Sequence, residues 1–214
     1  MKKKPVIREI HTLNENRFIR LYDMEYEDGS HYYNASRKSR EDLCAVKEKP
    51  ELPDAVSGYV ALHCADGKDR LLLFYEYRYP TGQYVLSIPS GLIDAKDAEN
   101  GDPAVSAVIR EIREETGISL RETDKVTVLN PFVFNSPGMT DESTAIVAVE
   151  ADVSHLKELS QAGAEGTEVF DGFRLATKEE ALQLLRDGVD EHGIPYPFVT
   201  WGALMWFVNR PVQD

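Results

Sequence analysis

Apolar and polar positions alternate in several segments of the chain and predict short β-strands. Residues 17–36 predict a hairpin, because the strand-like "RFIRLYDMEY" is followed by the turn signal "EDGS" and by "HYYNAS". A second hairpin is expected over residues 56–79, around the turn "ADGKD". Further strands are expected at "QYVLSIP", "KVTVLNPFVF", "STAIVAVEAD" and "EVFDGFRLA".

Three segments have the pattern of helices instead. One begins with a capping aspartate, Asp102, and ends at Gly117, which suits a left-handed helix stop. A second, "TKEEALQLLRDG", opens with a capping box formed by Thr177 and Glu180 and is expected to end at Gly188. The apolar stretch "PFVTWGALMWFV" predicts a helix packed on the core. Strands mixed with two or three helices predict an α/β/α sandwich around a mixed sheet.

Composition and spacing suggest a division into two regions. Residues 1–55 are strand-rich and aromatic but end in a charged stretch with "KPELP", so we expect an N-terminal antiparallel strand region that makes a poor domain alone. Residues 56–214 are expected to form the main domain. The total of 214 residues and the apolar fraction of 42% are enough for a sizeable core.

The charge of the chain narrows the possible partners. A formal net charge of −13 argues against nucleic acid and against an anionic membrane surface. A phosphate-bearing substrate remains possible, because a bound divalent cation inverts the local field. Cys44 and Cys64 fit no metal-binding pattern, and neither a signal peptide nor a membrane span is apparent. We therefore expect a cytoplasmic protein.

The first predicted helix carries an unusual group of carboxylates. With successive residues about 100° apart, Glu111, Glu114 and Glu115 share an arc of about 100°, beside the predicted buried face rather than opposite it. Like charges at these spacings repel, and the small side chains of Ala104 and Ala107 leave the arc open. Carboxylates at this density suit Mg²⁺ or Mn²⁺. Geometry alone leaves both a metal site and a solvated charged face open.

The segment "REIREETGI" resembles the Nudix hydrolase signature. That signature reads Gly, five residues, Glu, seven residues, then Arg-Glu-apolar-x-Glu-Glu-x-Gly-apolar, and residues 110–118 match its second half in place. The first half departs from it. Gly91 lies five residues too far upstream, "AKDAEN" has the appearance of an insertion, and Asp102 takes the place of the earlier Glu.

Other segments resemble the ADP-ribose pyrophosphatase branch of that superfamily. "EYRYPTGQYVLSIPSGLID" is similar to its "QYR" followed by "ELPAGLID", although Ser87 stands where relatives often carry Glu. "NSPGMTDE" resembles the branch's "SPGxxxE" loop, and "NASR" resembles its N-terminal "SR" element. Together these segments cover about residues 30–185.

The resemblance implies metal-dependent chemistry and a set of ligands. The family cleaves a diphosphate between a nucleoside and another group, using water and a divalent metal such as Mg²⁺ or Mn²⁺. By resemblance the metal ligands are Glu111, Glu114, Glu115 and the backbone carbonyl of Ser90. Arg110 is implied to orient a glutamate. The alternative role, an ion pair with Glu114 four residues later on the helix, is nearly the same claim.

The remaining site residues are expected at three places. Arg78 is a candidate phosphate clamp, since a guanidinium matches phosphate oxygens, or else a surface arginine on a strand. Glu142 is expected to shape the site or to bind near the ribose. The resemblance places the general base on a loop before a late strand, where Glu168 is preferred, Glu165 competes and Asp171 already lies within the strand.

The expected function is hydrolysis of a nucleoside diphosphate sugar, with ADP-ribose giving AMP and ribose 5-phosphate. Another nucleoside diphosphate derivative or a dinucleotide is the alternative within the enzyme class. A nucleotide-sugar sensor without turnover is the alternative outside it, but the three retained glutamates favour an enzyme. The resemblance also implies a homodimer in which an N-terminal sheet swaps between subunits, so residues 1–55 are expected to be the dimerisation region.

Overall fold

The computed structural model describes residues 3–47, 52–153, 159–163 and 168–210. The chain forms two compact units. The first contains Met1–Asp54 and Phe132–Thr144, and the second contains Ala55–Pro131 and Ala145–Asp214. The first unit thus includes a segment, 132–144, that the sequence-based division at residue 55 left with the main domain.

The first unit is built on a three-stranded antiparallel sheet in the order β1-β2-β3. These strands are β1 (Ile7–Glu15), β2 (Arg20–Tyr26) and β3 (His31–Ser36), followed by the short 3₁₀ helix η1 (Arg40–Asp42). The expected hairpin corresponds to β2 and β3, whereas β1 was not predicted. Its sequence "IREIHTLNE" contains no buried residue, so the pattern that reveals a half-buried strand is weak there.

The second unit is organised around a seven-stranded sheet with a main order of β10-β5-β4-β9-β8. β6 pairs with the second half of β5, and β7 pairs with the start of β4. The strands are β4 (Ala55–His63), β5 (Asp69–Arg78), β6 (Gln83–Ser87), β7 (Ser90–Leu92), β8 (Lys125–Phe134), β9 (Ser143–Asp152) and β10 (Phe170–Ala176).

The seven-stranded sheet is mixed, as expected. β5 runs antiparallel to β4, β6 and β10. β4 and β9 run parallel, because the Asp54 amide donates to the Ser143 carbonyl at one end while the Val153 amide donates to the His63 carbonyl at the other. The sheet therefore combines antiparallel hairpins with a parallel pair.

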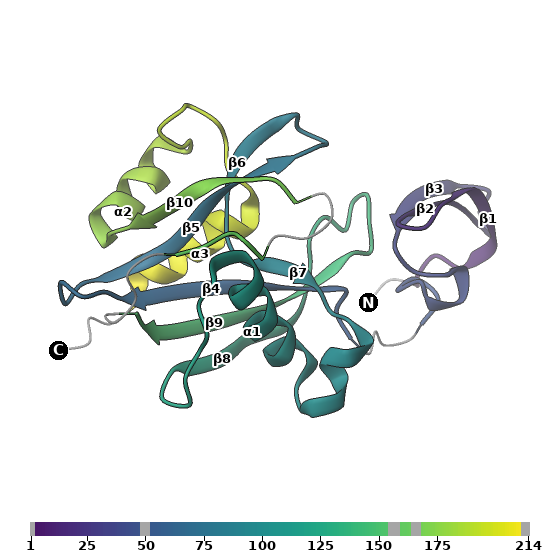
Figure 1. The fold of residues 1–214 in the computed structure, drawn as a ribbon. Coiled ribbons are helices and arrows are strands. Elements are labelled where there is room, and N and C mark those ends of the chain that lie inside the picture. Colours follow the sequence, from purple (N-terminus) through teal and green to yellow (C-terminus); the bar gives the residue numbers. More distant parts are fainter. Residues whose placement is uncertain (1–2, 48–51, 154–158, 164–167, 211–214) are drawn as a thin grey trace. The chain divides into compact units, whose positions relative to one another are not determined.

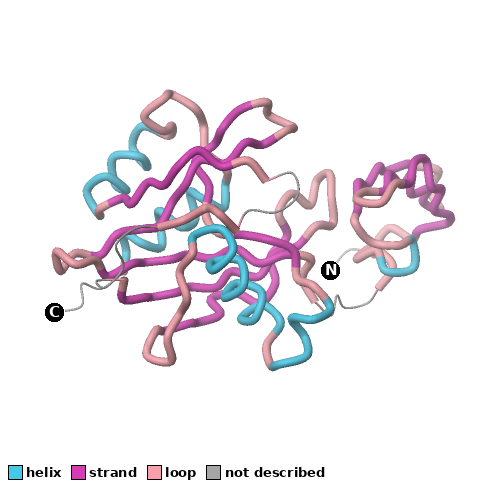
Figure 2. The backbone as a smooth tube through the Cα atoms, viewed as in Figure 1, coloured by secondary structure: helices cyan, strands magenta, loops and turns pink. Residues whose placement is uncertain are grey.

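Helices cover both faces of this sheet (Figures 1 and 2). α1 (Pro103–Thr116) lies in front of it in Figure 1, and α3 (Phe198–Asn209) lies behind. α2 (Lys178–Asp187) contacts α3, and the 3₁₀ helix η2 (Ala95–Asn100) precedes α1. Successive side chains of a strand point to opposite faces of the sheet and so enter different cores. Val60 on β4 belongs to the core under α1, whereas Ala61 belongs to the core under α2 and α3. The predicted α/β/α sandwich is confirmed.

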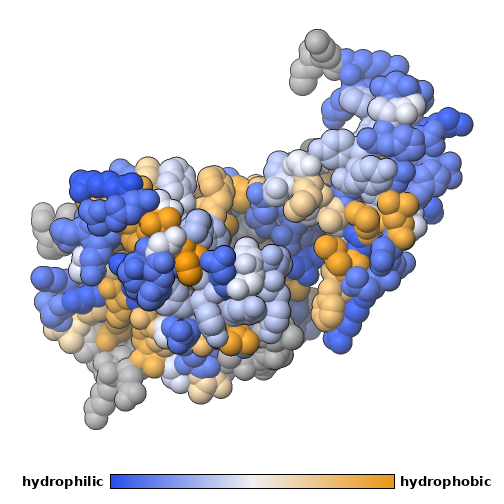
Figure 3. Space-filling model, turned by 90° about the horizontal axis from the view of Figure 1, so that it is seen from above, coloured by the Kyte–Doolittle hydropathy of each residue, from blue (hydrophilic) through white to orange (hydrophobic). Residues whose placement is uncertain are grey.

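The surface in Figure 3 is mostly hydrophilic, with hydrophobic residues in separate patches. Within the described part of the chain, every helix is too short or too polar to pass through a bilayer.

Candidate functional site

α1 presents its carboxylates because both ends of the helix are fixed. The Asp102 carboxylate accepts a hydrogen bond from the Ala104 amide at 2.9 Å, and Pro103 occupies the first turn. At the other end, Gly117 has φ 73° and donates to the Arg113 carbonyl. These predicted caps are confirmed. Between them, Glu111 and Glu115 are only 6% and 3% exposed, so the solvated-face interpretation does not hold for these two residues.

β7 lies directly against the two buried glutamates. A side chain at Gly91 would overlap the Glu111 carboxylate, so only glycine allows this approach. The Ser90 amide donates to Glu115 Oε2 at 3.2 Å. The structure therefore brings Ser90, Glu111 and Glu115 together, three of the four residues implied as metal ligands.

Arg110 connects the helix to the loop before it. Its guanidinium contacts Glu111 Oε1 at 2.7 Å and Glu114 Oε2 at 3.2 Å, and it donates to the Leu92 carbonyl at 2.9 Å and to Asp97 Oδ2 at 3.0 Å. Burial opposes its charge, but the hydrogen bond to Asp97 and the charge of Glu111 raise the pKa of Arg110 overall. Arg110 thus holds two glutamates of α1 at once, including the pair with Glu114 that its spacing indicated.

The acidic residue that holds Arg110 is Asp97, not Asp102. Spacing had assigned the earlier acidic position of the signature to Asp102, which acts instead as the helix cap. Asp97 lies in η2, is 5% exposed, and follows Gly91 by the five intervening residues that the signature requires. The additional residues therefore lie between Asp97 and Arg110, and the first half of the motif is intact apart from Asp in place of Glu.

Two further carboxylates, one on β5 and one just before β10, act through their charge on the glutamates of α1. Burial and then the charges of Glu111, Glu76 and Glu168 raise the pKa of Glu115 well above its ordinary value. Burial also raises the pKa of Glu111, against the opposing charge of Arg110. The charge of Glu168, an exposed residue just before β10, thus acts on both Glu111 and Glu115. Glu165 lies outside the described residues.

Glu76 on β5 is a member of this group that the sequence interpretation missed. It is 9% exposed, and burial raises its pKa, while Arg78 and the nearby Ser87 hydroxyl act in the opposite direction. One signal was available in the sequence. The branch reads "QYR" where this chain reads "EYR", and Ser87 replaces a frequent Glu, so one acid is gained on β5 where another is lost on β6.

Glu142 belongs to the first compact unit and is described within it. Its Oε1 accepts from Arg37 Nε at 2.8 Å, and its Oε2 accepts from Asn135 Nδ2 at 3.2 Å. The two segments that resembled the branch outside the core, "NASR" and "NSPGMTDE", are therefore joined by this ion pair. Arg78 lies in the second unit, where its Nη2 contacts Glu76 Oε2 at 2.7 Å.

The residues fit a divalent cation. Among the described residues, Arg78, Arg110 and Arg113 contact Glu76, Glu111 and Glu114, whereas no arginine contacts Glu115, which is 3% exposed and lies beside Glu111. Burying like charges together is unfavourable unless a cation balances them. Carboxylate and carbonyl oxygens are the donors that hard divalent ions prefer. The burial of Glu115 beside Glu111, at 3% and 6% exposure, is the observation that most directly indicates such an ion.

Comparison with known proteins agrees with this geometry. The chain is 30% identical over 148 residues to an ADP-ribose pyrophosphatase of Saccharomyces cerevisiae, covering 69% of this chain and 58% of that protein. It is 41% identical over 86 residues to putative nudix hydrolase 2 of Caenorhabditis elegans, covering 40% of this chain and 35% of that protein. The chain thus spans between about a third and three fifths of the length of these relatives.

A crystal structure of an ADP compounds hydrolase has the same fold, with a TM-score of 0.61 and 19% identity, and covers 96% of this chain and 92% of that one. Residues 56–197 match the NUDIX domain, a span that contains α1, β7 and every carboxylate described around them. The chain belongs to the NUDIX family.

Proposed function

We propose that this protein hydrolyses the diphosphate bond of a nucleoside diphosphate sugar, with ADP-ribose giving AMP and ribose 5-phosphate. The observation that carries the proposal is the buried pair Glu111 and Glu115 against the backbone of β7. The names of the relatives support the substrate class, since they include an ADP-ribose pyrophosphatase and an ADP-sugar pyrophosphatase of Mus musculus that is 25% identical over 146 residues.

Each residue then has a distinct task. Glu111, Glu115, Glu114 and the Ser90 carbonyl hold Mg²⁺ or Mn²⁺, which when bound neutralises diphosphate charge and acidifies water. Arg110 keeps two of the glutamates oriented. Arg78 binds phosphate oxygens through its guanidinium.

Glu168 accepts the proton of the attacking water. A new phosphorus–oxygen bond forms from that water, and the bond from the same phosphorus to the bridging oxygen breaks. The bridging oxygen leaves with the second phosphate. Glu168 suits this role because it is exposed just before β10, while its charge still reaches Glu111 and Glu115.

A substrate panel tests the proposal. Purified protein with Mg²⁺ or Mn²⁺ is incubated with ADP-ribose, other nucleoside diphosphate sugars and dinucleotides, and the phosphomonoester products are measured as phosphate after a phosphatase is added. We expect ADP-ribose to give the highest kcat/KM. A higher value for another diphosphate would reassign the substrate, and tight binding with no turnover of any member would make the chain a sensor.

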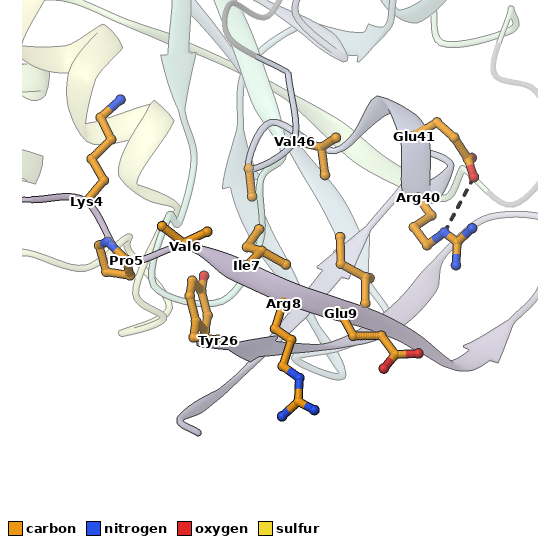
Figure 4. Close-up of a pocket in the computed structure, with 12 residues that line it drawn as sticks. Lys4, Pro5, Val6, Ile7, Arg8, Glu9, Tyr26, Arg40, Glu41 and Val46 are labelled. Carbon is orange, nitrogen blue, oxygen red and sulfur yellow. Dashed lines mark ion pairs between the residues drawn. The ribbon is translucent and has the colours of Figure 1, made fainter. Parts of the chain in front are cut away.

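We also propose that the protein works in the cytoplasm as a homodimer, built largely by residues 1–55. Several large apolar side chains of this region are exposed, among them Phe18 at 66% and Tyr33 at 58%. Val6, Ile7 and Val46, labelled in Figure 4, line a hollow in the first unit. Its volume is about 870 Å³. Such apolar surface is typical of an interface. The thiols Cys44 and Cys64 are unpaired, which suits a reducing compartment.

Light scattering tests the dimer. At micromolar concentration the full-length chain is expected to have twice the monomer mass, and a chain that starts at Ala55 is expected to be monomeric. A monomeric full-length protein would contradict the proposal, and so would a shortened chain that stays dimeric.

A further inference from the structure

β5 carries two opposite charges on one face. Glu76 and Arg78 are two residues apart on the strand, so their side chains project to the same side of the sheet. Arg78 Nη2 lies 2.7 Å from Glu76 Oε2. The two side chains differ in exposure, at 12% for Glu76 and 45% for Arg78. The pair therefore has a buried acidic end and a half-exposed basic end.

The buried end faces the carboxylate site of α1. The charge of Glu76 acts on Glu115, and the charge of Glu168 acts on Glu76. Ser87, on the neighbouring strand β6, lies beside Glu76. The adjacent residue Tyr77 projects to the other face of β5, where its ring packs against Tyr84 at 5.3 Å. The ion pair thus belongs to the face of the sheet that carries the proposed chemistry.

The guanidinium of Arg78 is suited to two partners at once. It carries five N–H donors in a planar fork, so one edge can pair with a carboxylate while another binds an anion. Glu76 contacts the Nη2 end, and almost half of the arginine side chain is exposed to solvent. An arginine held at one end in this way loses less rotamer freedom when an anion binds to the other end.

We propose that Glu76 is a positioning residue that fixes the Arg78 guanidinium for the diphosphate of the substrate. This inference rests on the proposed function, because it needs Arg78 to bind the substrate. A glutamine at position 76 has nearly the same shape but carries no charge, so it orients the guanidinium less strongly. The pair thus tunes substrate affinity and leaves the proton transfer to Glu168.

A double-mutant cycle measures this coupling. The single variants are Glu76→Gln and Arg78→Gln, and the double variant combines them. Asp66→Asn is a matched control, since Asp66, in the turn before β5, pairs with Arg70 at the opposite end of β5 from Arg78. Each variant is assayed for KM and kcat with ADP-ribose, for ADP binding and Mn²⁺ binding by calorimetry, and for its melting temperature.

We expect Glu76→Gln to raise KM about tenfold and Arg78→Gln to raise it about a hundredfold. The kcat should change less than about threefold, because the lost contacts bind the substrate and the transition state equally. The double variant should match Arg78→Gln, since Glu76 acts only through Arg78. ADP binding should weaken in parallel, whereas Mn²⁺ affinity and the Asp66→Asn control should stay near wild type. Arg78→Lys keeps the charge but not the fork, and it should also raise KM.

Three results would overturn the inference. Independent, additive effects of the two substitutions would show that Glu76 does not act through Arg78. A loss of Mn²⁺ affinity in Glu76→Gln as large as that in Glu115→Gln would make Glu76 a metal ligand. An unchanged KM and ADP affinity in Arg78→Gln would remove the substrate contact itself. If instead the wild type hydrolyses no diphosphate, the proposed function fails, and the ADP affinities still decide whether Glu76 positions Arg78.

Discussion

Two groups of acidic side chains in this protein differ in what balances their charge. On the first unit, Glu9, His11 and Glu25 bring ligand atoms within 4.8 Å of one another, as metal ligands do. On α1, Glu111 and Glu115 are nearly fully buried beside further carboxylates. By the number and type of ligands alone, the exposed group with its histidine resembles a metal site as closely as the buried group does.

Their surroundings separate the two groups. Glu25 already pairs with Arg8 at 3.0 Å, and the His11 ring lies 3.7 Å from Glu25 and 3.8 Å from Glu9. These side chains are more exposed than those of Glu111 and Glu115, at 62% for Glu9, 42% for His11 and 20% for Glu25, so solvent screens their charges more. Glu115 is 3% exposed and has no arginine in contact among the residues that the structure describes, and its pKa is raised by burial first and by like charges second. The comparison teaches that uncompensated burial, rather than ligand count, marks the site that needs a cation.

The largest expected effect is on turnover in Glu115→Gln. Glutamine keeps the shape of the side chain but is a poor ligand for a hard cation, so turnover should fall by more than about 10²-fold, since even outer-shell partners of metals cost 10–100-fold. The protein should remain folded, as measured by thermal melting alongside turnover. Glu25→Gln is the matched change in the exposed group and should keep wild-type activity. Near-wild-type turnover in Glu115→Gln would refute the metal-ligand role.

The next effect concerns the base. Glu168→Gln should lower turnover by about 10²–10⁴-fold, because a positioned general base contributes that much. Metal affinity and KM should be largely retained, and the pH–rate profile should lose its acidic limb. Glu165→Gln is the comparison variant. A large loss in Glu165→Gln with none in Glu168→Gln would move the base to Glu165, and no loss in either would point to a group at the metal itself.

A smaller effect separates the two aspartates before α1. Asp97→Asn removes the charge that ties Arg110 to η2, so Arg110 holds Glu111 and Glu114 less firmly, and turnover should fall about 10–100-fold. Asp102→Ala removes only the helix cap, which should lower the free energy of unfolding by about 1 kcal/mol and leave turnover nearly unchanged. Activity assays and chemical denaturation of both variants check the pair. The opposite pattern would restore Asp102 to the signature position.

The smallest effect is on stability and depends on pH. Below about pH 4.5, the ordinary pKa of a glutamic acid, Glu115 is protonated in both the folded and the unfolded chain. As pH rises, the unfolded chain loses this proton first, because the folded pKa is raised, so folding stability falls until the folded pKa is passed. Glu115→Gln has no ionisable group at this position, so this decrease in folding stability does not occur in the variant. Melting temperatures of the metal-free protein should show Glu115→Gln becoming more stable relative to wild type as the pH rises from about 4.5 to neutrality.

Much of the fold follows from local signals in the sequence. The caps of α1 and α2 were readable because Asp102, Gly117, Thr177 and Gly188 each satisfy a specific backbone need. β1 was not readable, because none of its residues is buried and its apolar positions do not alternate regularly. Local patterns thus report on helix ends and buried strands, and much less on an exposed edge strand.

The site was predictable only in part for a related reason. Helical spacing placed Glu111, Glu114 and Glu115 on one arc without reference to the rest of the chain. Glu76 reaches the same site from β5, and that requires the packing of the sheet against α1. The role of Asp97 depends on how η2 folds back onto Arg110, which spacing measured from the helix end could not show. Contacts between elements, rather than within them, account for what was missed.

Calorimetric titration with Mn²⁺ tests the central claim most directly, because it reads the cation site without relying on turnover. Wild type, Glu115→Gln and Glu25→Gln are titrated side by side at neutral pH and fixed ionic strength. The account predicts that wild type and Glu25→Gln bind Mn²⁺ with the same affinity. Glu115→Gln should show no binding over the Mn²⁺ concentrations that saturate wild type. Binding that survives in Glu115→Gln but is lost in Glu25→Gln would place the cation on the exposed group and contradict the account.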